Sequence, residues 1–181
     1  MAKRKFTGVI VSRCDERKLR AKLQKARQDA INLILTSLQM IGETCITIAR
    51  ERGDYNDITG NLRSSIGYII LNGGRVVTQT MAQRTTVAPG VRDVHRKRKD
   101  GSDYVAKQKI GGDGNEGARQ AAQLLERLKA RYPYGCVLIV CAGMEYAAYV
   151  ENVHGKRVLV DAQLEAEKLL DKLLGKFIEK R

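Results

Sequence analysis

One apolar stripe along residues 15–52 most constrains how this chain can fold. Its members recur at steps of three and four, which places them on one face of a helix: Leu19, Leu23, Ala26, Ala30, Ile34, Leu38, Ile41, Cys45 and Ile48. No proline interrupts the pattern, and Gly53 is a natural helix stop. Such a helix would be roughly 55 Å long, which exceeds the width of a compact domain. We therefore expect either that part of the stripe packs on another subunit or that the helix breaks near Gly42.

A β-hairpin is predicted after this helix. The sequence Asn72-Gly73-Gly74 is a strong hairpin turn signal, and apolar or β-branched residues flank it at 68–71 and 75–80. Further on, residues 136–141 are apolar at every position, as is typical of a central, buried strand. We expect the hairpin over 66–80 and this strand to share one sheet.

The remaining segments complete an α+β plan. Residues 84–114 lose periodicity and are interpreted as a long, basic, flexible surface loop. A helix is predicted from about Asn115 to Tyr132, closed by Pro133, and a last helix from an Asp161 N-cap to near Lys180. The prediction is one α+β domain over 1–181, with a small antiparallel or mixed sheet packed by the long N-terminal helix and a C-terminal helix.

Charge is the dominant compositional signal. The chain of 181 residues has 33 Lys and Arg against 20 acidic residues, a net charge of +13. The excess is concentrated in residues 1–27, at +8, and in residues 84–109, at +5. The second cluster contains the following candidate partner-binding residues: Arg96, Lys97, Arg98, Lys99, Lys107 and Lys109. Such clustering indicates an acidic partner, either nucleic acid or an acidic protein surface. No aromatic residue interleaves the Arg96–Lys99 run, so any nucleic-acid contact is expected to be electrostatic and independent of sequence.

The lengths of the apolar runs indicate where the protein is located, and the spacing of the cysteines indicates their chemical state. It has no uninterrupted run of 18 apolar residues, which predicts no membrane span, and no apolar stretch resembling a secretory signal follows the basic start. We expect the cytoplasm of the cell that makes it. The cysteines, Cys14, Cys45, Cys136 and Cys141, form no Cys-x-x-Cys pair and are predicted to be buried and reduced. Cys136 and Cys141 should point to opposite faces of their strand.

The sequence matches none of the catalytic or ligand-binding motifs considered. The two histidines, His95 and His154, lie in no metal-ligand pattern and are interpreted as solvent-exposed loop and turn residues. The glycines of 111–117 are followed by no Gly-Lys-Ser/Thr, and residues 54–65 begin like a calcium loop but end on Ser65 rather than glutamate. We expect no catalytic residue, no cofactor and no metal.

Two short segments carry a resemblance. The first is Asp57-Ile58-Thr59-Gly60-Asn61-Leu62-Arg63-Ser64-Ser65-Ile66, and the second is Ala142-Gly143-Met144-Glu145-Tyr146-Ala147-Ala148-Tyr149-Val150-Glu151. Each has a local interpretation: Thr59 can cap a helical turn that puts Leu62 and Ile66 on one face, and the spacing of Tyr146, Tyr149 and Val150 suits a core helix. Together and in this order, the segments resemble the tail-component family of long-tailed phages, whose members are tail-completion or head–tail joining proteins.

The resemblance implies specific residues and a role. The family pattern, Thr-Gly-x-Leu-Arg-x-Ser-Ile and later Tyr-Ala-x-Tyr-Val-Glu, matches Thr59, Gly60, Leu62, Arg63, Ser65, Tyr146, Ala147, Tyr149, Val150 and Glu151. It departs after Glu151, where Asn152-Val153-His154-Gly155 replaces an aromatic and Gly-Thr, and the basic stretch with its following helix is a large insertion. The implied role is non-enzymatic assembly at the head–tail junction, in the bacterial host cytoplasm and in the virion.

The expected partners are further copies of the chain in a ring, and neighbouring connector or tail proteins. Two other classes of function stay open. One is a sequence-independent nucleic-acid-binding protein, which would need only its basic face. The other is an enzyme with an unrecognised site, which a deep pocket with clustered carboxylates would favour.

Overall fold

The computed structural model describes residues 15–80 and 83–178, so Cys14 and half of the first basic cluster lie outside it. The chain divides into two compact units, 1–33 and 34–181, with the boundary inside helix α1, Glu16–Glu51. In the first unit, residues 15–30 are exposed and carry local ion pairs such as Arg20 to Glu16, 2.6 Å. Leu19 and Leu23 are 46% and 62% exposed there. Whether another subunit covers them stays a prediction, as does the single domain.

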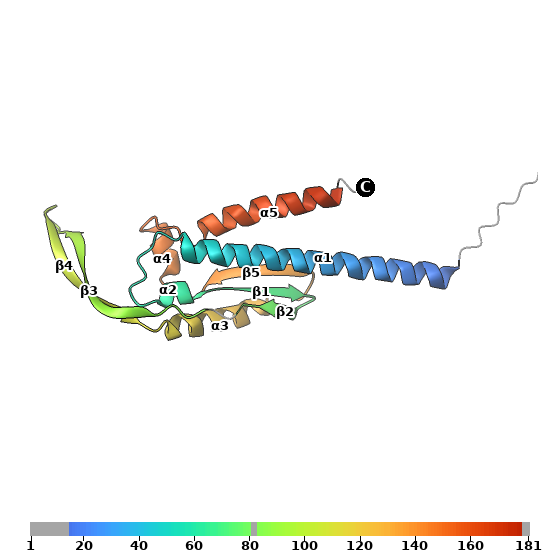
Figure 1. Ribbon diagram of the computed structural model, residues 1–181, viewed down its shortest axis with the longest axis horizontal. Helices are drawn as coiled ribbons and strands as arrows, with labels where there is room; N and C mark the ends of the chain where they lie inside the picture. Colours follow the sequence, from blue (N-terminus) through green and yellow to red (C-terminus); the bar gives the residue numbers. More distant parts are fainter. Residues whose placement is uncertain (1–14, 81–82, 179–181) are drawn as a thin grey trace, which may run out of the picture. The chain divides into compact units, whose positions relative to one another are not determined.

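The second unit is built on a three-stranded sheet. Its strands are β1, Ile66–Asn72; β2, Arg75–Gln79; and β5, Cys136–Ala142, in the order β2-β1-β5 with both pairs antiparallel. The turn at Asn72-Gly73-Gly74 needs positive φ at both glycines, 57° and 75°, which explains why the sequence marks it so clearly. The predicted hairpin, and its place in one sheet with 136–141, are confirmed (Figure 1).

Helices cover both faces of this sheet. On one face, the buried residues of α1 from Leu38 onward pack with Ile66, Tyr68 and Ile70 of β1, and α5, Val160–Ile178, packs against the same cluster. On the other face, helix α3, Asn115–Lys129, packs through Leu125 on Ile69 and Leu71. Cys136 joins the first cluster and Cys141 the second, which confirms that they point to opposite faces. The predicted α+β class is confirmed.

Helix α1 passes Gly42 without a break. The glycine lies against the ring of Tyr68, where an added Cβ would stand 2.9 Å from Cδ2. Gly42 therefore lets the helix approach β1 closely, and Tyr68 donates a hydrogen bond to Glu43 at 2.7 Å beside it. At the end of α1, Arg50 donates to the carbonyl of Ile66 at 2.8 Å. The predicted helix over 15–52 is confirmed within one residue at each end, and the alternative of a break near Gly42 is wrong.

The prediction of an irregular loop over 84–114 is wrong. Strands β3, Val87–Lys97, and β4, Asp103–Gly112, pair antiparallel into a two-stranded ribbon that is separate from the main sheet. Residues 83–112 contribute nothing to the buried core clusters. Both faces are solvated, so polar residues occupy positions that would be apolar in a packed strand, and the alternation is masked. Pro89 lies where the register shifts between Val87 and Gly90, which is the position at which a strand tolerates proline.

Two helix ends also differ from the prediction. Helix α3 ends at Lys129, before the expected Tyr132. Helix α5 begins at Val160, so Asp161 lies in its first turn and is not its N-cap. Two short helices complete the fold: α2, Asn61–Ser64, and α4, Ala147–Asn152. Helix α2 lies within the first of the two segments that carry the resemblance, and α4 lies mostly within the second.

Candidate functional site

The two motif segments, about eighty residues apart in the chain, meet at one corner of the sheet. The amide of Gly143 donates to the carbonyl of Ser65 at 2.9 Å, at the point where β1 begins and β5 ends. Leu62 and Ala147 are both buried in the cluster on the α1 side. We call this junction, formed by residues 57–66 and 142–151, the motif corner. These contacts are backbone hydrogen bonds and apolar packing, so they give the motif corner a structural role.

Gly60 is the tightest point of the motif corner. Its φ is +77°, and an added Cβ would lie 1.9 Å from the carbonyl oxygen of Thr85. A hydrogen bond holds Thr85 in this position: its amide donates to the Ser64 hydroxyl at 2.8 Å. Since L side chains rarely adopt this φ and no room exists for one, only glycine suits the position.

The motif corner also holds the base of the ribbon. The amide of Gly111 donates to the carbonyl of Ile58 at 2.9 Å. A Cβ on Gly112 would lie 2.4 Å from the carbonyl oxygen of Thr59, so the two backbones touch. Together with the Thr85 contact, these bonds fix the ends of both ribbon strands on residues 58–64. The first motif segment therefore positions the inserted ribbon.

The same segment joins helix α3 to the sheet. The Asn61 side chain accepts a hydrogen bond from the amide of Gly117 at 3.2 Å, and a Cβ on Gly117 would meet the Asn61 backbone at 1.9 Å. Asp57 accepts a hydrogen bond from the amide of Arg63 at 3.1 Å and so pairs one of the amides at the start of helix α2 that have no partner within the helix. The Arg63 guanidinium lies over the ring of Tyr55 at 5.6 Å. Thr59 contributes a long hydrogen bond of 3.4 Å from the amide of Asn61.

Glu151, the last residue of the second motif, caps helix α5. One carboxylate oxygen, Oε1, accepts hydrogen bonds from the amides of Leu159 at 2.8 Å and Val160 at 2.9 Å. A carboxylate at a helix N-terminus satisfies amides that have no partner in the helix and interacts favourably with the helix dipole. This contact explains in structural terms why the motif ends in a glutamate.

The tyrosines of the second motif are not core residues. Val150 packs against the core and Ala147 is buried, whereas Tyr146 and Tyr149 are 40% and 55% exposed. Partial burial and the nearby Asp57 carboxylate raise the pKa of Tyr146, whose hydroxyl also interacts with Thr59. The ring of Tyr149 packs edge-on against His154, with centroids 5.0 Å apart. Helix α4 is short and lies at the surface, so the spacing that suggested a buried stripe leaves both rings accessible.

The ribbon divides the six predicted partner-binding residues between two faces. In an antiparallel pair, residues opposite one another in register share a face, and successive residues alternate. The register pairs Arg92 with Gln108 and Arg96 with Tyr104, and it pairs Asp93 with Lys107 and Lys97 with Asp103. Arg96 therefore lies on the face opposite Lys97, Lys107 and Lys109.

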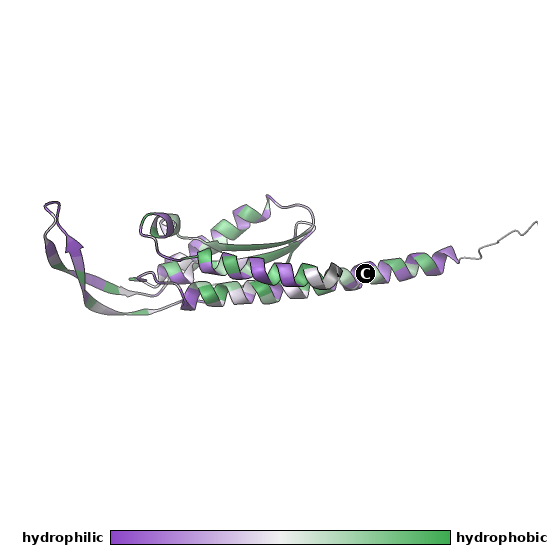
Figure 2. Cartoon of the chain, turned by 90° about the horizontal axis from the view of Figure 1, so that it is seen from above, coloured by the Kyte–Doolittle hydropathy of each residue, from purple (hydrophilic) through white to green (hydrophobic). Residues whose placement is uncertain are grey.

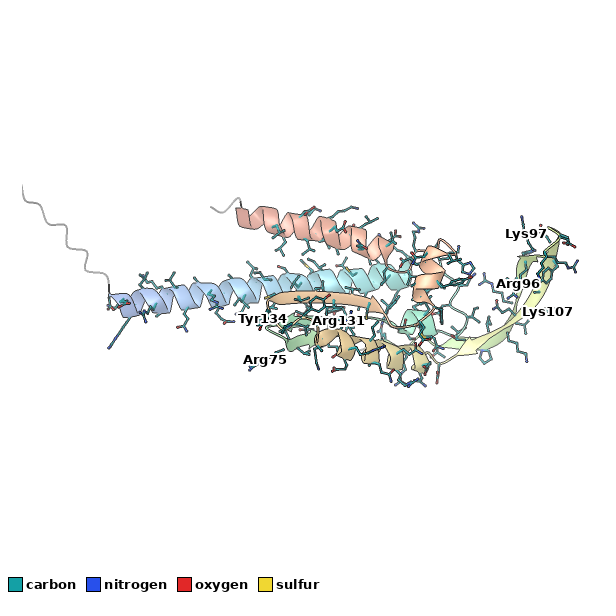
Figure 3. All side chains as sticks on the ribbon, turned by 180° about the vertical axis from the view of Figure 1, so that it is seen from behind. Arg75, Arg96, Lys97, Lys107, Arg131 and Tyr134 are labelled. Carbon is teal, nitrogen blue, oxygen red and sulfur yellow. The ribbon has the colours of Figure 1, made fainter. Side chains whose placement is uncertain are left out.

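One of these, the arginine face, carries positive charge without carboxylates. It is formed by Gly90, Arg92, Val94, Arg96, Tyr104, Ala106, Gln108 and Ile110. The Arg98 guanidinium extends over the Tyr104 ring at 5.2 Å, which adds a third arginine to this side. Arg92 donates to the Asn56 side chain at 2.9 Å near the ribbon base. Figure 3 shows Arg96, Lys97 and Lys107 on the ribbon.

The lysine face mixes both signs of charge. Lys97 stands opposite Asp103 and Lys107 opposite Asp93, with His95 and Lys109 beside them. Opposite charges facing one another across a ribbon partly neutralise each other. Arg98 and Lys99 lie near the turn, where Asp100 accepts hydrogen bonds from the amide and hydroxyl of Ser102. An acidic partner would therefore meet a more uniform positive surface on the arginine face.

One exposed group was missed by the sequence analysis. Arg75, Arg131 and Tyr134 lie at the far end of the sheet from the motif corner (Figure 3), and Tyr134 is 85% exposed. Arg75 is distant in the sequence from Arg131 and Tyr134, and the packing of the β1–β2 turn against Pro133 brings it to the same end. No sequence pattern could have grouped them.

An apolar and a polar cavity, each of about 500 Å³, lie in the described part of the second unit. The apolar cavity lies between α1, β5 and α5. The polar cavity is lined by Glu43, Glu51, Arg50, Arg63 and Arg84 among others. Within residues 15–80 and 83–178, no three His, Cys, Asp or Glu side chains gather closely enough to hold a metal ion.

Helix α1 is long and apolar enough to cross a membrane by length and composition alone. The sequence predicted no membrane span because charged and polar residues interrupt its apolar runs. Seven residues of α1, from Leu38 to Ala49, are buried in the protein core, and such burial is typical of a core helix.

Comparison with known proteins adds no relative. No protein-family model, curated protein or solved structure matches this chain.

Proposed function

We propose that this chain is a structural protein of a phage or prophage tail, which completes the tail or joins it to the head by assembling with copies of itself and with neighbouring proteins. The observation that carries the proposal is the motif corner. The two segments that resemble the tail-component family meet through the Gly143 to Ser65 hydrogen bond of 2.9 Å. Two of their residues have specific structural roles: Gly60 allows the close backbone approach to Thr85, and the Glu151 carboxylate caps helix α5.

The order of elements supports the same proposal. A long helix leads into the first motif and a hairpin, and a later strand leads into the second motif and the closing helix α5. Under this proposal the motif corner is the part that the chain shares with the family it resembles, and the ribbon is an insertion specific to this chain. The proposed role requires no catalytic group, since assembly draws on buried area and complementary charge.

The ribbon is the proposed contact to an acidic neighbour. A two-stranded ribbon without a core is marginally stable alone, so a partner that covers one face would stabilise it. The arginine face suits that contact best, because guanidinium groups bind carboxylates and phosphates in a bidentate manner and no acidic side chain on this face competes. The exposed Tyr146 and Tyr149 provide a second surface of the kind enriched at protein interfaces.

A sequence-independent nucleic-acid-binding protein is the second candidate. The arginine face favours it, because a two-stranded ribbon fits the major groove of B-DNA and arginines contact phosphates. The two candidates differ in salt dependence. Binding to DNA releases condensed counterions, so its affinity falls steeply with salt, by a slope near −0.9 for each phosphate neutralised.

The experiment compares two double variants that remove equal charge from different faces. Arg96→Ala with Arg98→Ala changes the arginine face, and Lys107→Ala with Lys109→Ala changes the lysine face. In a phage that depends on this chain, we expect the arginine variant to lower the yield of infectious particles at least tenfold more than the lysine variant. Equal yields from both variants would contradict a role for the arginine face.

Titration with duplex DNA separates the candidates. The slope of log affinity against log salt concentration is measured for both variants. A DNA-binding function predicts that the arginine variant reduces the size of this slope by up to about 1.8, which corresponds to two phosphate contacts at about 0.9 each. A chain that shows no salt-dependent DNA binding at low ionic strength is not a DNA-binding protein, and the tail proposal then depends on an acidic protein partner.

A further inference from the structure

Strand β5 has the sequence of a central strand but lies at an edge. Its residues, Cys-Val-Leu-Ile-Val-Cys-Ala, are apolar on both faces, which predicted a buried central position. The central strand is instead β1, whose residues Ile66 and Tyr68–Leu71 are completely buried. Within the described residues, β5 pairs with β1 alone, and only Cys141 of its seven residues is buried. One side of β5 thus offers unpaired backbone groups. Figure 2 shows the strands of the main sheet in the green of apolar residues.

The two edges of the sheet are not equivalent. Strand β2 has five residues, begins with Arg75, and its register with β1 shifts between Ile70 and Leu71. A short strand, a charge and an irregular register are features that discourage edge pairing. Strand β5 pairs with β1 over seven residues without a shift, and it contains no charged residue and no proline. The β5 edge is therefore the one suited to accept another strand.

An apolar groove runs beside this edge. The cavity of about 500 Å³ between α1, β5 and α5 is lined by Leu38, Cys45, Leu138, Val140, Ala166 and Leu170 among others. It opens over the face of β5 that packs toward α1 and α5. A strand added to β5 would direct alternate side chains into this groove, which gives both backbone pairing and a pocket for side chains.

We propose that residues 6–11 of a second copy of the chain add to the β5 edge as a fourth strand. This inference rests on the proposed assembly function. The segment reads Phe6-Thr7-Gly8-Val9-Ile10-Val11, with no charge and three successive β-branched residues. Val9, Ile10 and Val11 place apolar side chains on both faces of a strand, as the two-sided packing of β5 requires. Six residues extend about 20 Å, close to the length of β5.

Charge complementarity supports this occupant. The segment is preceded by Lys3-Arg4-Lys5 and followed by Arg13. On α5, Glu165 lies near enough to Cys45 of the groove to raise the pKa of that thiol, and Asp161 precedes the groove residue Ala162. These carboxylates pair with Lys168 and Arg157 in the described residues, and a basic segment could exchange with those partners. The segment lies outside the described residues, and in the sequence residues 12–37 lie between it and Leu38, the first groove residue. Exchange between copies would link each subunit to the next, as an open or closed ring requires.

Hydrogen–deuterium exchange of the full chain tests the proposal. The exchange of peptides covering 136–142 is measured at low and high protein concentration, with native mass spectrometry of the same samples. We expect exchange to slow at least tenfold at high concentration. The double variant Val9→Asp, Ile10→Asp should lose this protection. The matched control, Val76→Asp with Val77→Asp, adds the same charge at exposed positions of the β2 edge and should keep it.

Each other result overturns the proposal in its own way. Equal protection in the Val9→Asp, Ile10→Asp variant would mean that residues 6–11 are not the added strand. Protection that does not depend on concentration would mean that the segment docks within its own chain. Loss of protection in the β2 control would mean that sheet edges join directly. If native mass spectrometry shows association while β5 remains unprotected, this inference fails and the proposed assembly function stands.

Discussion

Replacing Gly60 by alanine tests the motif corner most sharply. An alanine at φ +77° costs about 1–2 kcal/mol through its left-handed backbone conformation. Its Cβ would also lie 1.9 Å from the Thr85 carbonyl oxygen, so that backbone must move by more than 1 Å to reach ordinary contact. Such a shift breaks the 2.8 Å hydrogen bond from Thr85 to Ser64, whose hydroxyl is buried, at a cost of about 1–3 kcal/mol. We expect a total loss of about 2–5 kcal/mol.

Gly135 provides a matched control, because its φ is also +77° but nothing lies within 4 Å of an added Cβ. Gly135→Ala therefore has the conformational cost alone, and the difference between the two variants isolates the contact with Thr85. Urea unfolding followed by far-ultraviolet circular dichroism gives both free energies of unfolding. We expect Gly60→Ala to be less stable than Gly135→Ala by about 1–3 kcal/mol. Equal losses would refute the argument that the close backbone approach holds the ribbon base.

Three further predictions concern single side chains. Glu151→Ala should destabilise the fold by about 1–2 kcal/mol in urea unfolding through loss of the α5 cap, and Glu151→Gln, which keeps an acceptor oxygen, should cost less. The Arg157 amide holds the pKa of Asp54 below its usual 3.8, so Asp54 stabilises the folded state above that pH and its contribution is lost as the pH falls through the lower folded pKa. Asp54→Asn should therefore flatten the acid limb of a plot of stability against pH. Burial raises the pKa of the Cys141 thiol from 9.0 to about 11, which lowers its thiolate fraction at pH 8 about 100-fold, so iodoacetamide should modify Cys141 rapidly only in urea.

The fold could be predicted where local signals and burial agree. The α1 stripe from Leu38 onward and the apolar run of β5 reflect packing against the core, and the turn at Asn72-Gly73-Gly74 reflects the positive φ of its two glycines, so each is visible in the sequence. The ribbon formed by β3 and β4 was missed because neither face has a core to satisfy, and its polar residues resemble those of a loop. The edge position of β5 is a property of strand order, which its own residues do not encode.

In the candidate site, too, the sequence indicates the local motifs but not the contacts between distant segments. The sequence pattern groups the motif residues, but their roles in the structure depend on partners distant in the sequence: Gly60 on Thr85, and Asn61 on Gly117. Glu151 was not expected to cap α5, because the amides it accepts from lie eight and nine residues away. The basic run at Arg96–Lys99 was treated as one unit, and only the strand register separates its arginine and lysine faces.

Mass spectrometry of purified phage particles tests the central claim most directly. Particles are prepared from a host whose phage or prophage carries the gene for this chain, and the protein is quantified against the capsid and tail-tube proteins. The proposed function predicts the chain in intact particles at a fixed, low copy number, and its loss should leave heads and tails that do not join. Infectious particles that lack the chain, or normal particle yields after its deletion, would contradict the proposed role in the tail.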